Sequence, residues 1–200
     1  MRLNHKNNFG RISISGFNQL ISRSVIEKAQ ANDQQSRAQI YKTYANACYT
    51  LAYRLCYEQM LAEDIVSEVF IKAFSQLHQF RFQGPFPGWL RRIVVHESFN
   101  KIKSERKFYT TNDEEILEIE TTDLFSTNWL SACIDLDYLL KQLPPKQRAV
   151  MILHELEGFK HKEIAELFGK SESFSKTTLT RAYQSLKMMV TEQEQQHALK

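Results

Sequence analysis

The sequence is poor in proline, glycine and cysteine, and it lacks any long apolar run. Only 4 Pro and 6 Gly occur among 200 residues, which argues against a loop-rich all-β fold and against a low-complexity chain. No run of about 18 apolar residues is present, so we expect no membrane insertion. The first 30 residues contain no apolar stretch typical of a secretory signal, which favours a cytoplasmic location. The 13 Phe, 8 Tyr and 2 Trp supply ample material for a folded core.

The three cysteines, Cys48, Cys56 and Cys133, form no CxxC pair, and any disulfide between two of them would leave the third as a free thiol. This pattern favours buried thiols in a reducing compartment over a disulfide or zinc framework. Cys48 and Cys56 lie in an apolar stripe and are predicted to be core residues.

The sequence contains two His-Glu pairs, at 96–97 and 154–155, which could begin the HExxH motif of a zinc hydrolase. That motif needs a second histidine four residues after the first. Asn100 stands at that position after His96, and Gly158 stands there after His154. His161 follows His154 by seven residues, about 10 Å along a helix that the glycine interrupts, so we predict no zinc site. Phosphate-binding, dinucleotide-binding and serine-hydrolase loops are also absent from the sequence. We therefore expect no metal, no cofactor and no catalytic residues.

Charge is unevenly distributed, although the net charge is only +3. Residues 81–107 contain seven Lys or Arg and two Glu, and residues 141–187 contain nine Lys or Arg and five Glu. The segment 108–140 contains eight acidic residues and no Lys or Arg. Two basic blocks around an acidic one fit two polyanion-binding surfaces joined by an acidic linker, and equally well three solvated faces.

Apolar residues recur at steps of three and four, the period of an amphipathic helix, along most of the chain after residue 36. The stripes run over residues 40–55, 61–77, 89–102 and 134–143. Two prolines and two glycines within residues 84–88 predict a loop, and Pro144-Pro145 separates two later helices. No segment alternates with period two, so the sequence predicts an all-α fold. We expect residues 1–35 to be an extension with one short helix near residues 17–30.

Residues 160–187 have the pattern of a helix-turn-helix. Gly169 permits a positive φ between a short helix at 162–168 and a longer one from about 172 to 189, for which Ser171 is the expected N-cap. The longer helix carries Leu179, Ala182 and Leu186 on one face. Donors suited to bases and phosphates occupy the opposite face: Lys176, Thr177, Thr180 and Arg181. A recognition helix in the DNA major groove needs this arrangement, although an ordinary helical hairpin with a solvated face shares it.

The C-terminal segment resembles a known family. Leu143-Pro144-Pro145, Glu157-Gly158, Glu163-Ile164-Ala165-Glu166 and Leu179-x-Arg181-Ala182 occur in the order typical of region 4 in bacterial sigma factors of the extracytoplasmic-function (ECF) group. The resemblance implies that the four exposed residues of the longer helix face the –35 promoter element. Lys170, Phe174, Ser175 and Tyr183 depart from the family pattern and bear on base preference.

Residues 62–74 resemble the region 2 helix of the same family, which docks on the clamp helices of RNA polymerase. The expected polymerase-binding face consists of Glu63, Asp64, Ser67 and Glu68. An acidic helical face suits a basic partner surface, and without the resemblance it would be interpreted as solvated charge.

Residues 86–103 resemble the segment that melts and recognises the –10 element. The implied residues are Trp89, Arg91, Arg92, His96, Asn100 and Lys103. A basic track suits one DNA strand, and aromatic surfaces suit its unstacked bases. Trp89 shares a helical face with Ile93, which favours a core position for it. His96 stands where the family usually has Asn, and Arg91 where an aromatic residue is common.

These observations predict two small helical domains joined by a flexible acidic linker. The expected boundaries are an extension at 1–35, a region 2-like domain at 36–107, a linker at 108–131, a region 4-like domain at 132–190 and a tail at 191–200. The predicted function is that of a sigma factor that binds core RNA polymerase and promoter DNA, with an anti-sigma factor as a further partner. A stand-alone helix-turn-helix regulator and an interaction protein without DNA binding are the alternatives.

Overall fold

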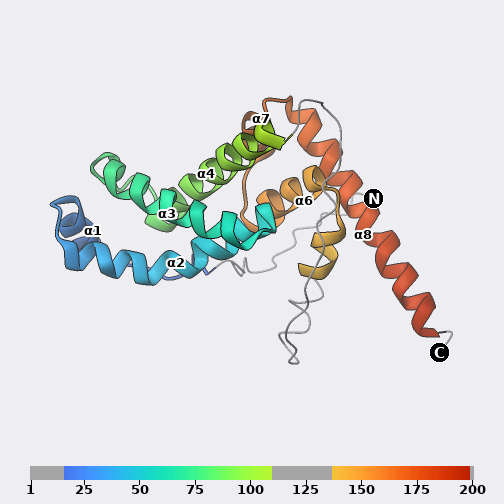
Figure 1. Cartoon of the computed structure of the whole chain (residues 1–200), viewed down its shortest axis with the longest axis horizontal. Helices are drawn as coiled ribbons and strands as arrows, with labels where there is room; N and C mark the ends of the chain where they lie inside the picture. The colour runs from blue at the N-terminus through green and yellow to red at the C-terminus, as the bar shows by residue number, and fades with distance from the viewer. Residues whose placement is uncertain (1–15, 110–136, 199–200) are drawn as a thin grey trace, which may run out of the picture.

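The computed structural model describes residues 16–109 and 137–198, with side chains over 16–104 and 137–191. Within these ranges the chain is helical and contains no strand, as the apolar periodicity predicts. An N-terminal bundle, formed by residues 16–109, lies beside a C-terminal domain, formed by residues 137–198 (Figure 1). The predicted linker at 108–131 lies outside the described residues from 110 onward, since residues 108 and 109 end α4, and Cys133 lies outside them as well.

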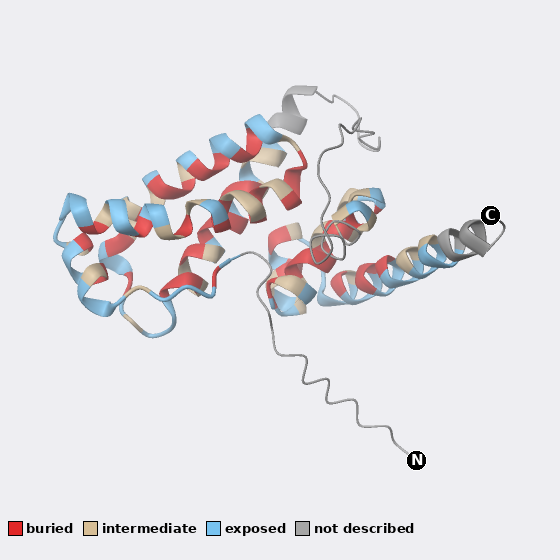
Figure 2. Cartoon of the chain, turned by 90° about the horizontal axis from the view of Figure 1, so that it is seen from below, coloured by how far each residue is buried: buried red, intermediate tan, exposed pale blue. Residues whose placement is uncertain are grey.

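The N-terminal bundle consists of α1 (Arg23–Gln30), α2 (Gln34–Cys56), α3 (Gln59–Gln76), the short 3-10 helix η1 (Leu77–Gln79) and α4 (Phe86–Tyr109). Helices α2, α3 and α4 pack on one another, and α1 packs against α2 and η1. Asp33 caps α2 by accepting a hydrogen bond from the backbone N–H of Ser36 at 2.8 Å. Tyr57, in the left-handed region at φ 55°, ends α2. Residues that the periodicity placed in the core, such as Ile40, Leu51 and Ile65, are buried. Figure 2 shows buried and exposed positions following one another along the helices of this bundle.

The C-terminal domain begins with a helical segment at residues 137–142. It continues with α6 (Pro145–Met151), a π-helical turn η2 (Ile152–Leu156), α7 (His161–Phe168) and the long α8 (Glu172–Ala198). Pro145 occupies the first turn of α6 as predicted. Helices α6 and α7 both pack on α8. Val150, Leu153 and Ile164 are fully buried between them.

The structure refines two sequence-based expectations. The predicted loop at 84–88 ends earlier, because Phe86 already begins α4 and Pro87 is tolerated in the first turn, where a backbone N–H has no helical acceptor. The helix rise of about 10 Å between His154 and His161 does not describe their separation, because the expected interruption at Gly158 lets their rings stack at 4.2 Å between centroids. Gly158 has a φ of 70°, which turns the chain back on itself.

The two described cysteines are core residues, as predicted. Cys48 and Cys56 are free and buried. Burial raises the pKa of the Cys48 thiol far above its usual range and that of Cys56 to about 11, so both remain protonated near neutral pH. Within the described ranges, no helix is both long enough and apolar enough to span a bilayer.

Gly169 offers a test of the turn between α7 and α8. Its φ is 62°, and a Cβ built there meets nothing within 4 Å, so an added methyl group clashes with no neighbour. We expect Gly169→Ala to lower the free energy of unfolding by about 1 kcal/mol, purely through the left-handed backbone. Chemical denaturation of both proteins measures this. An unchanged stability would show that the turn does not constrain this residue.

Candidate nucleic-acid interface

The recognition-helix candidate α8 presents two opposite faces. Its inner face is buried at Ser175, Leu179 and Ala182 against α6 and α7, and Thr178, which sequence reasoning did not place, is buried as well. The four side chains predicted to face DNA are all exposed: Lys176, Thr177, Thr180 and Arg181. The face carrying them is therefore accessible to a duplex.

Local contacts organise this exposed face. Lys176 pairs with Glu172 one turn earlier at 2.7 Å, and both side chains are about half exposed. The hydroxyls of Thr177 and Thr180 donate to helix carbonyls at 2.8 and 3.0 Å, which fixes their direction. Ser171, the predicted N-cap, accepts from the backbone N–H of Phe174 at 3.4 Å. The helix thus begins where the sequence predicts.

A second basic face runs along α4. Arg92, His96, Asn100 and Lys103 follow one another at steps of four, four and three, and all four are exposed. That spacing places them on one side of the helix. We call these four residues the α4 strip. Its donors outnumber its acceptors, which suits a phosphate backbone and base edges.

Trp89 and Lys101 lie on the same helix but do not belong to the strip, and neither does Arg91, which is described below. Trp89 is half buried, and its ring packs at 5.5 Å against both Phe80 and Phe86. It therefore contributes to an aromatic cluster, as its shared face with Ile93 indicates. Lys101 points to α3, where its ammonium lies 2.9 Å from Glu68 and 3.9 Å from Asp64.

The acidic face of α3 is exposed at Glu63, Asp64 and Ser67 and half buried at Glu68. Lys101 partly neutralises its C-terminal end. Glu63 accepts from the side chain of Gln59 at 3.0 Å. The structure therefore brings the four predicted polymerase-binding residues together, with a cation of α4 beside them.

The C-terminal domain touches the α4 strip directly. Arg92 pairs with Glu163 at 3.0 Å, and Lys103 donates to the backbone carbonyl of Leu167 at 3.2 Å. Arg91, half buried, lies 3.4 Å from the fully buried carboxylate of Glu157. Residues predicted to bind DNA thus contact α7 and the turn before it. The sequence did not predict these contacts, because the two partners of each contact lie 64–71 residues apart along the chain.

Aromatic contact reinforces the same junction. The ring of Phe99 on α4 meets that of Phe168 on α7 edge to face at 5.0 Å between centroids. A pocket of about 580 Å³ opens between the two domains near the start of α4. Its walls include the aromatic residues Phe80, Trp89 and Phe159 and the basic residues Arg81 and Arg92.

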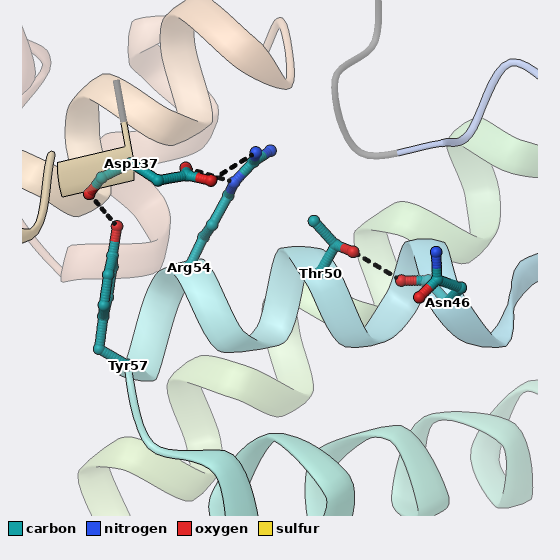
Figure 3. Close-up of polar contacts among 5 residues, drawn as sticks. All are labelled: Asn46, Thr50, Arg54, Tyr57 and Asp137. Carbon is teal, nitrogen blue, oxygen red and sulfur yellow. Dashed lines mark hydrogen bonds and ion pairs between the residues drawn. The ribbon is translucent and has the colours of Figure 1, made fainter. Parts of the chain in front are cut away.

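A separate polar contact joins α2 to the segment at 137–142 (Figure 3). The nearly buried guanidinium of Arg54 donates two hydrogen bonds to the Asp137 carboxylate, at 3.0 and 3.2 Å. The Tyr57 hydroxyl donates to the Asp137 carbonyl at 3.2 Å, and the guanidinium of Arg148 lies 4.3 Å from the Tyr57 ring centre. Burial, and then the charge of Asp137, raise the pKa of Tyr57 well above its usual range. Sequence reasoning missed all of these residues.

The Arg54–Asp137 pair predicts a measurable coupling between the domains. Asp137→Ala leaves the buried guanidinium of Arg54 without its carboxylate partner. We expect the free energy of unfolding to fall by about 2 kcal/mol, less than for a fully buried pair, because the Asp137 side chain is 42% exposed. Urea denaturation of the whole chain measures this loss. Asp137→Asn, which keeps one acceptor, should lose less. Equal stability of Asp137→Ala and the unchanged protein would contradict the pairing.

Comparison with known proteins identifies the family. The Sigma-70 region 2 model matches residues 40–108, and the Sigma-70 region 4 model matches residues 133–186. The chain is a sigma factor of the sigma-70 family. This family is not one of catalytic enzymes.

Relatives place the sigma factor in the ECF group. It is 27% identical over 166 residues to the ECF RNA polymerase sigma factor BldN of Streptomyces coelicolor, covering 81% of this chain and 63% of the relative. The match thus spans less than two thirds of the length of BldN. It is 24% identical over 181 residues to the ECF RNA polymerase sigma factor SigW of Bacillus subtilis, covering 84% of this chain and 96% of the relative.

A solved structure supports the fold of this sigma factor. The sigma factor RpoE of Bartonella quintana, crystallised in complex with the anti-sigma factor NepR, superposes with a TM-score of 0.52. The identity is 22%, and the match covers 77% of this chain and 96% of the other. The N-terminal bundle and the C-terminal domain therefore correspond to sigma regions 2 and 4, as the resemblance of the sequence implied.

Proposed function

We propose that this sigma factor binds core RNA polymerase and directs it to promoters through two separate DNA contacts. The observation that carries the proposal is the pair of exposed basic faces, one on α4 and one on α8, in two domains that follow the family order. The α4 strip would bind the single strand of the –10 element. The exposed face of α8 would enter the major groove of the –35 element.

The polymerase contact is assigned to α3. Glu63, Asp64, Ser67 and Glu68 form one accessible acidic and polar face, which is complementary to a basic partner surface. Lys101, which pairs with Glu68, marks the C-terminal end of that face. The domain boundaries that we propose are 36–107 for region 2, 108–131 for the linker and 132–190 for region 4. We propose that the protein acts in the cytoplasm. An anti-sigma factor is a further proposed partner, supported by the complex in which the Bartonella relative was solved.

The proposed function is tested by adding the purified chain to core RNA polymerase and measuring run-off transcription from a promoter library. We expect initiation that depends on the chain and selects common sequences at two spaced elements. A charge-reversal variant, Glu63→Lys with Asp64→Lys, should lose polymerase binding without loss of fold, because both side chains are exposed. Tight duplex binding without any effect on the polymerase would instead support a stand-alone regulator.

Arg181 provides a prediction for the –35 contact. A bidentate contact from its guanidinium to guanine contributes about 1–3 kcal/mol of discrimination. We therefore expect Arg181→Ala to weaken binding of the holoenzyme to its preferred –35 sequence by roughly 5- to 150-fold. Competition between preferred and substituted –35 duplexes measures the change. An unaltered preference would remove Arg181 from the base-reading residues, whereas uniform weakening would make it a phosphate contact.

A further inference from the structure

The loop between η1 and α4, residues 80–85, has an apolar base and a polar rim. Phe80 is buried and Phe82 is half buried, whereas Arg81, Gln83 and the two residues after it are exposed. Phe82 adopts a positive φ of 56°, which is unfavourable for a residue with a bulky side chain. Contacts elsewhere in the protein must therefore hold the 80–85 loop in this conformation.

Helix α1 supplies these contacts from about 50 residues away. The side-chain amide of Gln30 donates to the carbonyls of Leu77 and Phe80, both at 2.9 Å, so that its two N–H groups hold the first residue of η1 and the start of the loop. The guanidinium of Arg23 lies 4.5 Å from the ring centre of Phe82. The amide nitrogen of Gln30 donates both hydrogen bonds, whereas a carboxylate at position 30 has no donor and would repel both carbonyls.

The 80–85 loop also forms a wall of the pocket beside α4. Phe80, Arg81 and Gln83 line this pocket together with Trp89 and Arg92. Arg81 and Gln83 carry donors and acceptors that can distinguish base edges, and Arg92 belongs to the α4 strip. A shift of the loop would move these polar groups relative to a DNA strand on α4.

We infer that Gln30 and Arg23 are positioning residues for base selection in the –10 element. They do not touch DNA themselves, but they fix the backbone of the 80–85 loop and with it the side chains of Arg81 and Gln83. The inference rests on the proposed function, since it assumes that the α4 strip binds the –10 strand. It gives α1, which the sequence left as an extension without a role, a specific task in promoter choice.

The experiment uses the full chain with core RNA polymerase and a promoter library randomised only in the –10 element. Gln30→Met keeps the size of the side chain and removes both donors, and Arg23→Ala removes the contact to Phe82. The matched controls are Gln39→Met and Lys28→Ala, which make the same kinds of change at exposed positions of α2 and α1. Sequencing of the run-off products gives the preference for each base, and a second library randomised in the –35 element gives the reference.

Each hydrogen bond lost at position 30 should reduce the population of the observed loop conformation about fivefold. We therefore expect Gln30→Met to reduce the ratio between the best and worst base at –10 by about fivefold or more, with an unchanged –35 preference. Arg23→Ala should change the same positions about twofold, and both controls should leave them unchanged. Arg23 is exposed, so its variant tests the inference even if Gln30→Met unfolds.

Two results would overturn the inference, and they differ from failure of the proposed function. Uniformly lower transcription with unchanged base preference would make Gln30 and Arg23 structural residues only. Equal changes in the controls would show a general charge or stability effect. If the unchanged chain directs no transcription at all, the proposed function fails, and the inference fails with it.

Discussion

Joining α4 to α7 by a short cross-link is expected to reduce transcription by this sigma factor to background. Three basic residues that the sequence predicts to bind DNA contact the C-terminal domain in the structure: Arg91, and Arg92 and Lys103 of the α4 strip. These contacts and a bound DNA strand require the same side chains, so the two states exclude each other. The domains must therefore separate at this junction before the α4 strip binds DNA.

The cross-link is introduced at the aromatic contact between the two helices. Phe99→Cys and Phe168→Cys place thiols where the rings now meet, and a short cleavable bismaleimide joins them. Cys133→Ser removes one other thiol, whereas Cys48 and Cys56 are buried and protonated. Cleavage of the linker should restore transcription, and each single-cysteine variant treated alike should remain active. Full activity of the joined protein would contradict this exclusion, because initiation would then proceed while the junction is closed.

Removing two charges from the α4 strip should have the next largest effect. Each phosphate contact on single-stranded DNA contributes about 0.7 to the slope with which the logarithm of the affinity falls against the logarithm of the salt concentration. Arg92→Ala with Lys103→Ala should therefore lower the affinity for the –10 strand roughly 25-fold at about 0.1 M salt and reduce the slope by about 1.4. Binding of the holoenzyme to a –10 oligonucleotide across a salt series measures both quantities.

The control for this variant removes the same net charge elsewhere. Lys28 and Lys42 are exposed on α1 and α2, and their double alanine variant should retain both affinity and slope. Loss of Arg92 and Lys103 also removes contacts with Glu163 and the Leu167 carbonyl, which by itself would favour separated domains and stronger binding. A decrease in affinity therefore reports contact with DNA. An unchanged slope in the α4 variant would contradict the proposed path of the strand.

The local parts of the fold were predictable because their signals lie within a few residues of one another. Gly169 indicated a left-handed turn, Pro145 a helix start, and the three-and-four spacing of apolar residues the buried faces of α4 and α8. Exposure of the α8 donors followed from that spacing, since residues opposite a buried face are solvated. The outward direction of the α4 strip followed in the same way.

The long-range polar contacts were not predictable. Gln30, Arg54 and Asp137 are ordinary surface residue types in helical segments, and nothing near them in the sequence indicates a partner 47–83 residues away. Lys101 belongs to the basic block at 81–107 and lies next to Asn100 of the α4 strip, yet one step along a helix turns a side chain by about 100°. That rotation directs Lys101 to Glu68 and Asp64 on α3.

The central claim is that α4 binds the –10 element and α8 binds the –35 element. It is tested most directly by measuring variants of each helix on promoters randomised at each element. Run-off transcription with core RNA polymerase is measured for Arg181→Ala and for Arg92→Ala with Lys103→Ala, on two libraries randomised separately at the –35 and –10 elements. We predict that the α8 variant changes preference only in the –35 library. The α4 variant should reduce –10-dependent initiation and leave the –35 preference intact. Altered preference at both elements in either variant would contradict separate DNA contacts by the two domains.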